Sequence, residues 1–172
     1  SQQLNDDRAE AGGGLTVGIV SRLAPFKDLN NFLRAAAIVA SSRPMVEFRI
    51  VGDGAERERL ECLASEFGLL EQVTFTGSLN DPTDEIRQFD VCVLSSNARG
   101  NELFPNVLLE YMVCGKPVVA TDVGAVRELV FESSVGIVIP PESPRDMAEA
   151  ILSLLNDEGL RSRIGGNAAR HA

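Results

Sequence analysis

Short apolar runs rich in Val, Ile and Phe alternate along the chain with longer stretches whose apolar residues recur with helical spacing. The short runs are bounded by turn residues and predict β-strands, and the longer stretches predict amphipathic helices. The expected strands are residues 15–20, 45–51, 72–77, 90–95, 117–121 and 135–140. The expected helices are residues 28–41, 55–67, 104–114, 124–130, 144–156 and 157–170, with a weaker helical signal over 83–89.

This alternation predicts an α/β fold, a Rossmann-like three-layer α/β/α domain around a six-stranded parallel sheet. Right-handed crossovers bring the carboxyl ends of all strands to one edge, and ligands bind there, where the strand order reverses. Site residues should therefore follow strands. Residues 1–14 are polar and end in three glycines, which is typical of a disordered linker or a vector-derived remnant. The domain is expected to span residues 15–172.

Composition narrows the classes of partner. Sixteen basic residues against 25 acidic ones give a net charge of −9, which disfavours nucleic acid and anionic lipid as primary partners. The sequence shows neither a bilayer-spanning apolar run nor an export signal, so a cytoplasmic protein is expected. Cys62, Cys92 and Cys114 are widely spaced and are expected to be buried, reduced thiols. The single histidine, His171, and the absence of a CxxC pair argue against a structural zinc site.

Two cations follow the first expected strand, in the segment between Arg22 and Lys27. On a strongly acidic protein, a planar guanidinium and a compact ammonium in one short loop suit a diphosphate. Surface cations paired with neighbouring carboxylates would give the same spacing, so both interpretations stay open at this point.

The second expected strand is followed by Gly52, Asp53 and Gly54, and then by Arg57. This segment nearly matches the dinucleotide fingerprint GxGxxG, but Arg57 stands where the third glycine should allow close helix packing. A tight strand-to-helix turn that borders a ligand cleft is favoured over a site for NAD.

The segment after the fourth strand, residues 97–110, carries the most chemistry. Pro105 suits the first turn of a helix that Gly115 ends, and the free N–H groups at its start would face the ligand edge. Glu102 precedes this helix and Glu110 lies within it. The two carboxylates would either accept hydrogen bonds from the vicinal hydroxyls of a polyol or be solvated and salt-bridged. The residues alone leave both interpretations open.

Taken together, these residues resemble the donor-binding C-terminal domain of the GT-B retaining glycosyltransferases, in particular glycosyltransferase family 4 (glycosyl transferases group 1). The resemblance covers about residues 17–169 and implies the C-terminal half of a GT-B fold. E-x7-E alone is weak, whereas all of the markers in this order are highly specific. The markers are R-x4-K at 22–27, VGDG at 51–54, VTFTG at 73–77, and E-x7-E at 102–110 leading into residues 108–129.

The resemblance assigns roles to these positions. Arg22 and Lys27 would neutralise the diphosphate of a nucleotide sugar, and with Glu102, which would contact the transferred sugar, they are the expected catalytic residues. Glu110 would hold the nucleotide ribose. Main-chain N–H groups at the helix start would reach the phosphates, and the loop at 77–79 would border the base. The full expected donor site is Arg22, Lys27, Gly77, Leu79, Glu102, Phe104, Pro105, Asn106, Val107 and Glu110.

The implied reaction moves a sugar from a nucleotide diphosphate sugar, with UDP or GDP as candidate carriers, to an acceptor hydroxyl with retention. The product would be a polysaccharide, glycolipid or glycoconjugate. The two cations and the helix dipole would stabilise the leaving diphosphate, so no cofactor and no metal are expected. The family's N-terminal acceptor-binding domain has no counterpart in residues 1–14. The isolated chain is therefore expected to bind donor without transferring sugar, and any membrane association would belong to that other domain.

Two residues depart from the family pattern. Leu103 replaces a glycine after the first glutamate, where a glycine permits close backbone approach, so a reshaped sugar subsite is expected. Ser21 replaces a glycine before the arginine, which is a milder change.

Other classes fit parts of the pattern. A phospho-receiver domain would need paired acids at the end of the first strand, where this chain has Ser21 and Arg22. A sugar-nucleotide epimerase-type enzyme on the same fold stays open. A non-catalytic module that binds a sugar nucleotide or a protein partner stays open as well.

Overall fold

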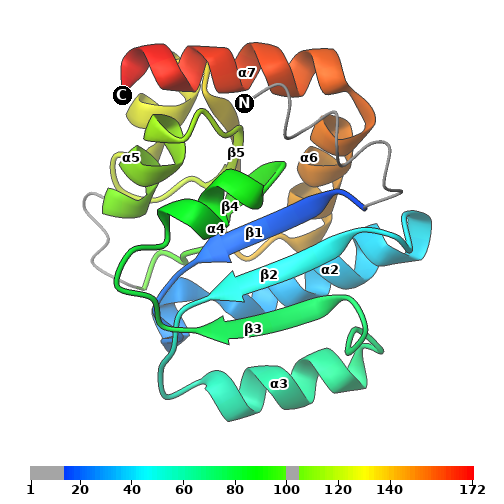
Figure 1. Ribbon diagram of the computed structural model, residues 1–172. Coiled ribbons are helices and arrows are strands. Elements are labelled where there is room, and N and C mark those ends of the chain that lie inside the picture. Colours follow the sequence, from blue (N-terminus) through cyan, green and yellow to red (C-terminus); the bar gives the residue numbers. More distant parts are fainter. Residues whose placement is uncertain (1–13, 100–104) are drawn as a thin grey trace.

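The computed structural model describes residues 14–99 and 105–172, which form one parallel sheet with helices on both faces (Figure 1). The strands are β1 (Thr16–Val20), β2 (Glu47–Val51), β3 (Val73–Gly77), β4 (Val91–Leu94), β5 (Val118–Thr121) and β6 (Gly136–Ile139). The helical elements are η1 (Pro25–Lys27), α2 (Leu29–Ser42), α3 (Arg57–Glu66), α4 (Thr83–Gln88), α5 (Asn106–Val113), η2 (Arg127–Glu132), α6 (Pro144–Asn156) and α7 (Glu158–His171).

The sheet order is β3-β2-β1-β4-β5-β6, and each neighbouring pair is parallel. The chain builds outward from β1 to β3 and then returns to the centre to build outward from β4 to β6. The order therefore reverses between β1 and β4, and a cleft is expected above their carboxyl ends. The predicted six-stranded Rossmann-like sheet is confirmed.

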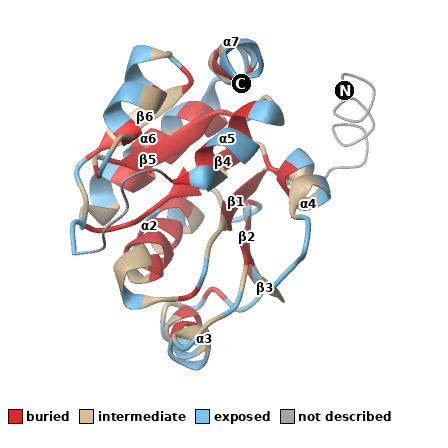
Figure 2. Ribbon diagram, turned by 90° about the vertical axis from the view of Figure 1, so that its left-hand side faces the viewer, coloured by how far each residue is buried: buried red, intermediate tan, exposed pale blue. Residues whose placement is uncertain are grey.

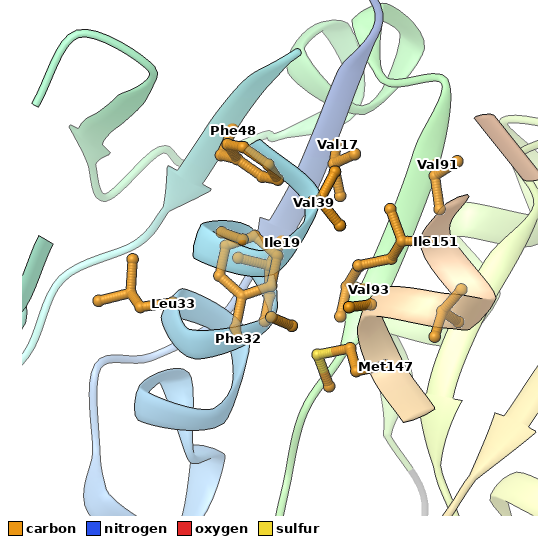
Figure 3. Packing of buried hydrophobic residues seen from close by; sticks show 14 of the residues in the cluster. Val17, Ile19, Phe32, Leu33, Val39, Phe48, Val91, Val93, Met147 and Ile151 are labelled. Atoms are coloured by element: carbon orange, nitrogen blue, oxygen red, sulfur yellow. The ribbon is translucent and has the colours of Figure 1, made fainter. Parts of the chain in front are cut away.

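Alternation along the strands sorts the core into two layers. Val17 and Ile19 of β1 and Val93 of β4 face α2, α3 and α6, whereas Cys92 and Leu94 of β4 face α4, α5, η2 and α7. Figure 3 shows the first layer, in which side chains of α2 and α6 meet those of the central strands. Figure 2 shows buried residues gathered along the central strands and the inward side of α2. Both faces of the sheet are thus covered, as a parallel sheet requires.

The strand bounds agree with prediction to within about two residues at each end, and the weak helical signal at 83–89 is confirmed as α4. The helix predicted over 104–114 is described from Asn106, so Pro105 is its N-cap instead of a residue within its first turn. The helix predicted over 124–130 was wrong in bounds and type. Gly124 has a φ of 53°, so the chain turns there, and the π-helix Arg127–Glu132 follows.

Three further expectations concern the N-terminal linker, the cysteines and membrane-spanning helices. The expected linker over residues 1–14 lies, apart from Gly14, outside the described residues. The three cysteines carry free thiols, but only Cys92 is buried, because Cys62 lies on the outer side of α3 and Cys114 at the end of α5. Among the helices that the structure describes, none is long and apolar enough to cross a membrane.

Candidate functional site

A cleft of about 1040 Å³ opens at the carboxyl edge of the sheet, above β1, β2 and the start of α5. Loops from both halves of the sheet line it, so the cleft lies at the point where the strand order reverses. Its lining residues are Val20, Ser21, Arg22, Phe26, Lys27, Val51, Gly52, Asp53, Ser78, Leu79, Asn80, Pro82, Pro105, Asn106, Val107 and Glu110.

Arg22 and Lys27, the predicted cations, both line this cleft. Phe26 lies with them: the Arg22 guanidinium carbon is 5.4 Å and the Lys27 ammonium 5.2 Å from the centre of its ring. An aromatic ring attracts cations at this distance. One ring therefore holds two like charges in the same part of the cleft, which offsets part of their repulsion and concentrates positive potential on an acidic protein.

The loop that carries the cations is tied to the loop after β2. The main-chain nitrogen of Ser21 donates to the carbonyl oxygen of Val51 at 2.9 Å, and that of Leu23 donates to Asp53 at 2.9 Å. Glycine is required at Gly52 for this approach, because its φ is 138° and a Cβ there would lie 1.8 Å from the carbonyl oxygen of Ser21. The glycines of the near-fingerprint therefore serve loop packing at the edge of a cleft, as the sequence favoured.

Glu110 projects into the cleft from α5. Partial burial raises the pKa of its carboxyl, and the nearby negative charge of Asp81 raises the pKa further. No ion pair involving Glu110 exists among the described residues. A carboxylate with spare acceptor capacity inside a cleft is suited to hydroxyl donors.

The start of α5 forms the adjoining wall. Pro105 is buried and extended at the N-cap, and Asn106 and Val107 are the first two helical residues. The N–H groups at the first helical positions have no carbonyl oxygen of a preceding turn as hydrogen-bond acceptor, and the helix dipole adds partial positive charge there. Pro105 itself offers no N–H, so any phosphate contact at this wall must come from its neighbours.

Tyr111, on the same helix, fixes the position of α5 above the sheet. Its fully buried hydroxyl accepts a hydrogen bond from the main-chain nitrogen of Val20 at 2.8 Å and donates to the carbonyl oxygen of Val93 at 3.2 Å. The ends of β1 and β4 are thereby bridged through a side chain of the helix that carries Glu110.

Residues after β3 form the third wall. Leu79 lines the cleft with 44% of its surface exposed, and Ser78, Asn80 and Pro82 lie beside it. Gly77 ends β3 and does not line the cleft. Its carbonyl oxygen accepts a hydrogen bond from the main-chain nitrogen of Gly52 at 2.8 Å, which holds the two loops together.

The structure thus brings seven predicted site residues to one cleft: Arg22, Lys27, Leu79, Pro105, Asn106, Val107 and Glu110. Glu102 and Phe104, together with the substituted Leu103, lie outside the described residues. Sequence reasoning missed Phe26, although its place between the two cations was a visible signal. It also missed Tyr111, whose role depends on a contact between α5 and β1 that no local pattern reveals.

Comparison of the sequence with known protein families gives one match that includes the residues of this cleft. Residues 2–171 match the profile of the family described as glycosyl transferases group 1. The chain belongs to this family. The glycosyltransferase group 1 match covers almost the whole chain, including the strands and helices that build the cleft.

Relatives of this glycosyltransferase domain bear the names of sugar-transferring enzymes. Alpha-D-kanosaminyltransferase of Streptomyces kanamyceticus is 38% identical over 152 residues, which cover 87% of this chain and 39% of that protein. D-inositol 3-phosphate glycosyltransferase of Thermobispora bispora is 33% identical over 164 residues, covering 89% and 38% respectively. The chain therefore spans about two fifths of the length of these relatives.

Solved structures agree on the fold. The crystal structure of Anabaena HepE in complex with UDP aligns with a TM-score of 0.85 and 28% identity, over 98% of this chain and 47% of that one. The glycosyltransferase WaaG, involved in lipopolysaccharide biosynthesis, aligns with a TM-score of 0.83 and 23% identity, over 98% of this chain and 46% of that one. At this identity, the likeness to WaaG concerns the fold alone.

Proposed function

We propose that this glycosyltransferase domain binds the donor, a nucleotide diphosphate sugar, for an enzyme that transfers the sugar to an acceptor hydroxyl. The observation that carries the proposal is the convergence of Arg22, Lys27, the start of α5 and Glu110 on one cleft at the carboxyl edge of the sheet. Paired cations beside a helix start suit a diphosphate, and a carboxylate nearby suits the ribose hydroxyls.

In the proposed mechanism, negative charge grows on the diphosphate as the bond to the sugar breaks. Arg22 and Lys27 would stabilise this charge more in the transition state than in the bound donor, which lowers the barrier. Glu110 would fix the nucleoside end through its carboxylate. As the family resemblance implies, the sugar is transferred to the acceptor hydroxyl with its anomeric configuration retained, and Glu102 contacts the sugar. The binding site for the acceptor would lie in another part of the longer protein.

The two cations would serve in place of a metal ion, and the proposed reaction needs no cofactor. Over the described residues, no group of three or more His, Cys, Asp and Glu side chains could hold a metal. A direct test is donor binding in the presence of a chelator: affinity unchanged by EDTA supports the proposal, and a loss that Mg²⁺ or Mn²⁺ restores contradicts it.

UDP is the first nucleotide to test, since HepE, at 28% identity, carries UDP in its solved structure. Calorimetric titration of the chain with UDP, GDP and ADP should give measurable binding for one of them. We expect Arg22→Ala and Lys27→Ala each to weaken binding about tenfold or more, because a charge-assisted contact is lost. Arg163→Ala, which removes an exposed cation on α7, serves as the matched control.

Three outcomes separate the candidate functions. Nucleotide binding lost with either cation supports the donor site. Binding of none of the three nucleotides points to a module for a protein partner. Sugar transfer by the isolated chain would contradict the proposal that the acceptor site lies in another domain. The named glycosyltransferase relatives speak against the epimerase alternative.

A further inference from the structure

The cations of the cleft depend on a very short element. Lys27 ends η1, a single 3-10 turn, whose own hydrogen bonds are Lys27 N to Ala24 O at 3.0 Å and Asp28 N to Pro25 O at 3.2 Å. An isolated 3-10 turn has poor hydrogen-bond geometry and little intrinsic stability. The turn therefore needs outside support to hold its side chains in one place.

That support comes from the loop after β4. The Ser95 hydroxyl donates to the carbonyl oxygen of Lys27 at 2.6 Å, and the main-chain nitrogen of Asn97 donates to that of Phe26 at 2.9 Å. A longer contact of 3.5 Å joins the Asn97 amide to the carbonyl oxygen of Pro25. All three carbonyls of η1 are thus held from one direction.

The supporting loop is itself rigidly placed. Ser95 is 1% and Asn97 6% exposed, so water cannot compete for these contacts. The hydroxyl of Thr121, fully buried in β5, donates to the carbonyl oxygen of Ser96 at 2.6 Å. The Asn97 side chain closes the loop by accepting from the main-chain nitrogen of Arg99 at 3.0 Å. The loop thereby links η1 to the centre of the sheet.

We propose that Ser95 is a positioning residue for the donor site: its hydroxyl fixes the Lys27 backbone, so that the Lys27 ammonium, held beside the Phe26 ring, faces a bound diphosphate. This inference rests on the proposed function. A buried serine with a purely structural role would lower stability without affecting nucleotide affinity through Lys27. The distinguishing property is therefore energetic coupling between Ser95 and Lys27 in ligand binding.

A double-mutant cycle measures that coupling. UDP is titrated into the original chain, Ser95→Ala, Lys27→Ala and the double variant, with urea unfolding of each. We expect Ser95→Ala to weaken UDP binding about fivefold, which corresponds to one lost hydrogen bond. In the Lys27→Ala background the same change should have almost no further effect. Ser42→Ala is the matched control, since its hydroxyl donates to Val39 O at 3.1 Å at the other end of α2.

Ser95→Cys provides a second variant of similar volume with a weaker donor, and its affinity should fall between those of the original chain and Ser95→Ala. If the original chain binds UDP and Lys27→Ala weakens it, but Ser95→Ala has no effect or an additive one, the inference is overturned. If the original chain binds none of UDP, GDP and ADP, the proposed function fails instead.

Discussion

The hydroxyl oxygen of Tyr111 lies 2.8 Å from the main-chain nitrogen of Val20, at the last residue of β1. The register of β1 and β4 pairs Val17 with Val91 and Gly18 with Cys92. Val20 lies beyond these pairs, and its main-chain N–H donates to the tyrosine hydroxyl. The strand that leads into Arg22 is thereby tied to the helix that carries Glu110.

Tyr111→Phe should therefore destabilise the fold. The change removes both hydrogen bonds of the buried hydroxyl, the one from the half-buried N–H of Val20 and the one to the carbonyl oxygen of the buried Val93, which costs about 1–3 kcal/mol of unfolding free energy. Urea denaturation followed by circular dichroism measures the loss. Thr76→Val is the control, since it removes a half-buried hydroxyl with a longer contact of 3.3 Å to Ile50 O. Equal stability of Tyr111→Phe and the original chain would contradict this role of the tyrosine.

Two neighbouring glycines in α7 should respond oppositely to alanine. A Cβ at Gly165 would lie 2.4 Å from the carbonyl oxygen of Gly115, so Gly165→Ala must push α7 away from the end of α5, costing about 1–3 kcal/mol. Gly166 has no atom within 4 Å of such a Cβ, so Gly166→Ala should stabilise by about 0.5–1 kcal/mol through helix propensity. Chemical denaturation of both variants tests the contact, and effects of the same sign would refute it.

The raised pKa of Glu110 predicts a pH dependence of stability. The ordinary value is 4.5, and partial burial and Asp81 raise it in the folded protein. Because the folded state binds this proton more tightly than the unfolded chain, unfolding free energy decreases as pH rises from 4.5 through the raised pKa. Glu110→Gln should remove this component, giving a gain in stability at neutral pH that vanishes in acid. An unchanged pH profile would show that the carboxyl is not perturbed.

The same carboxyl should govern donor binding in acid. Under the proposed function, the Glu110 carboxylate accepts from ribose hydroxyls, so affinity for a UDP-sugar should fall as pH decreases through the raised pKa. Asp81→Asn removes the second cause of the shift and should move the midpoint to lower pH. Calorimetry across pH follows the midpoint. A midpoint that stays in place in Asp81→Asn would mean that another group controls the profile.

Binding of UDP should weaken as salt concentration rises, because both proposed partners of the diphosphate are cations. The dependence of affinity on salt should be shallower in Lys27→Ala, which retains Arg22 alone. Glu110→Gln, which alters a residue assigned to the ribose, should keep a slope as steep as that of the original chain. If UDP affinity depends on salt equally steeply in Lys27→Ala and in the original chain, Lys27 does not contact the diphosphate.

The sequence predicted the centre of the sheet well because β4 and β5 are the buried runs VCVL at 91–94 and VVAT at 118–121, and such runs have few alternatives. It failed at η2, because no local pattern distinguishes the π-helix Arg127–Glu132 from an ordinary helical turn. The cleft-lining cations were predictable because they follow β1 directly. The contacts of Ser95 and Tyr111 were not, since each joins elements far apart in the chain.

The cleft draws its walls from separate halves of the sheet. The loop at 78–82 follows β3 at one edge, whereas the start of α5 follows β4 at the centre. Since these walls share no strand, evolution can exchange one without redesigning the other. Under the proposed function, in which the loop after β3 borders the base, a change within the five residues 78–82 would alter the choice of nucleotide without displacing Arg22 and Lys27.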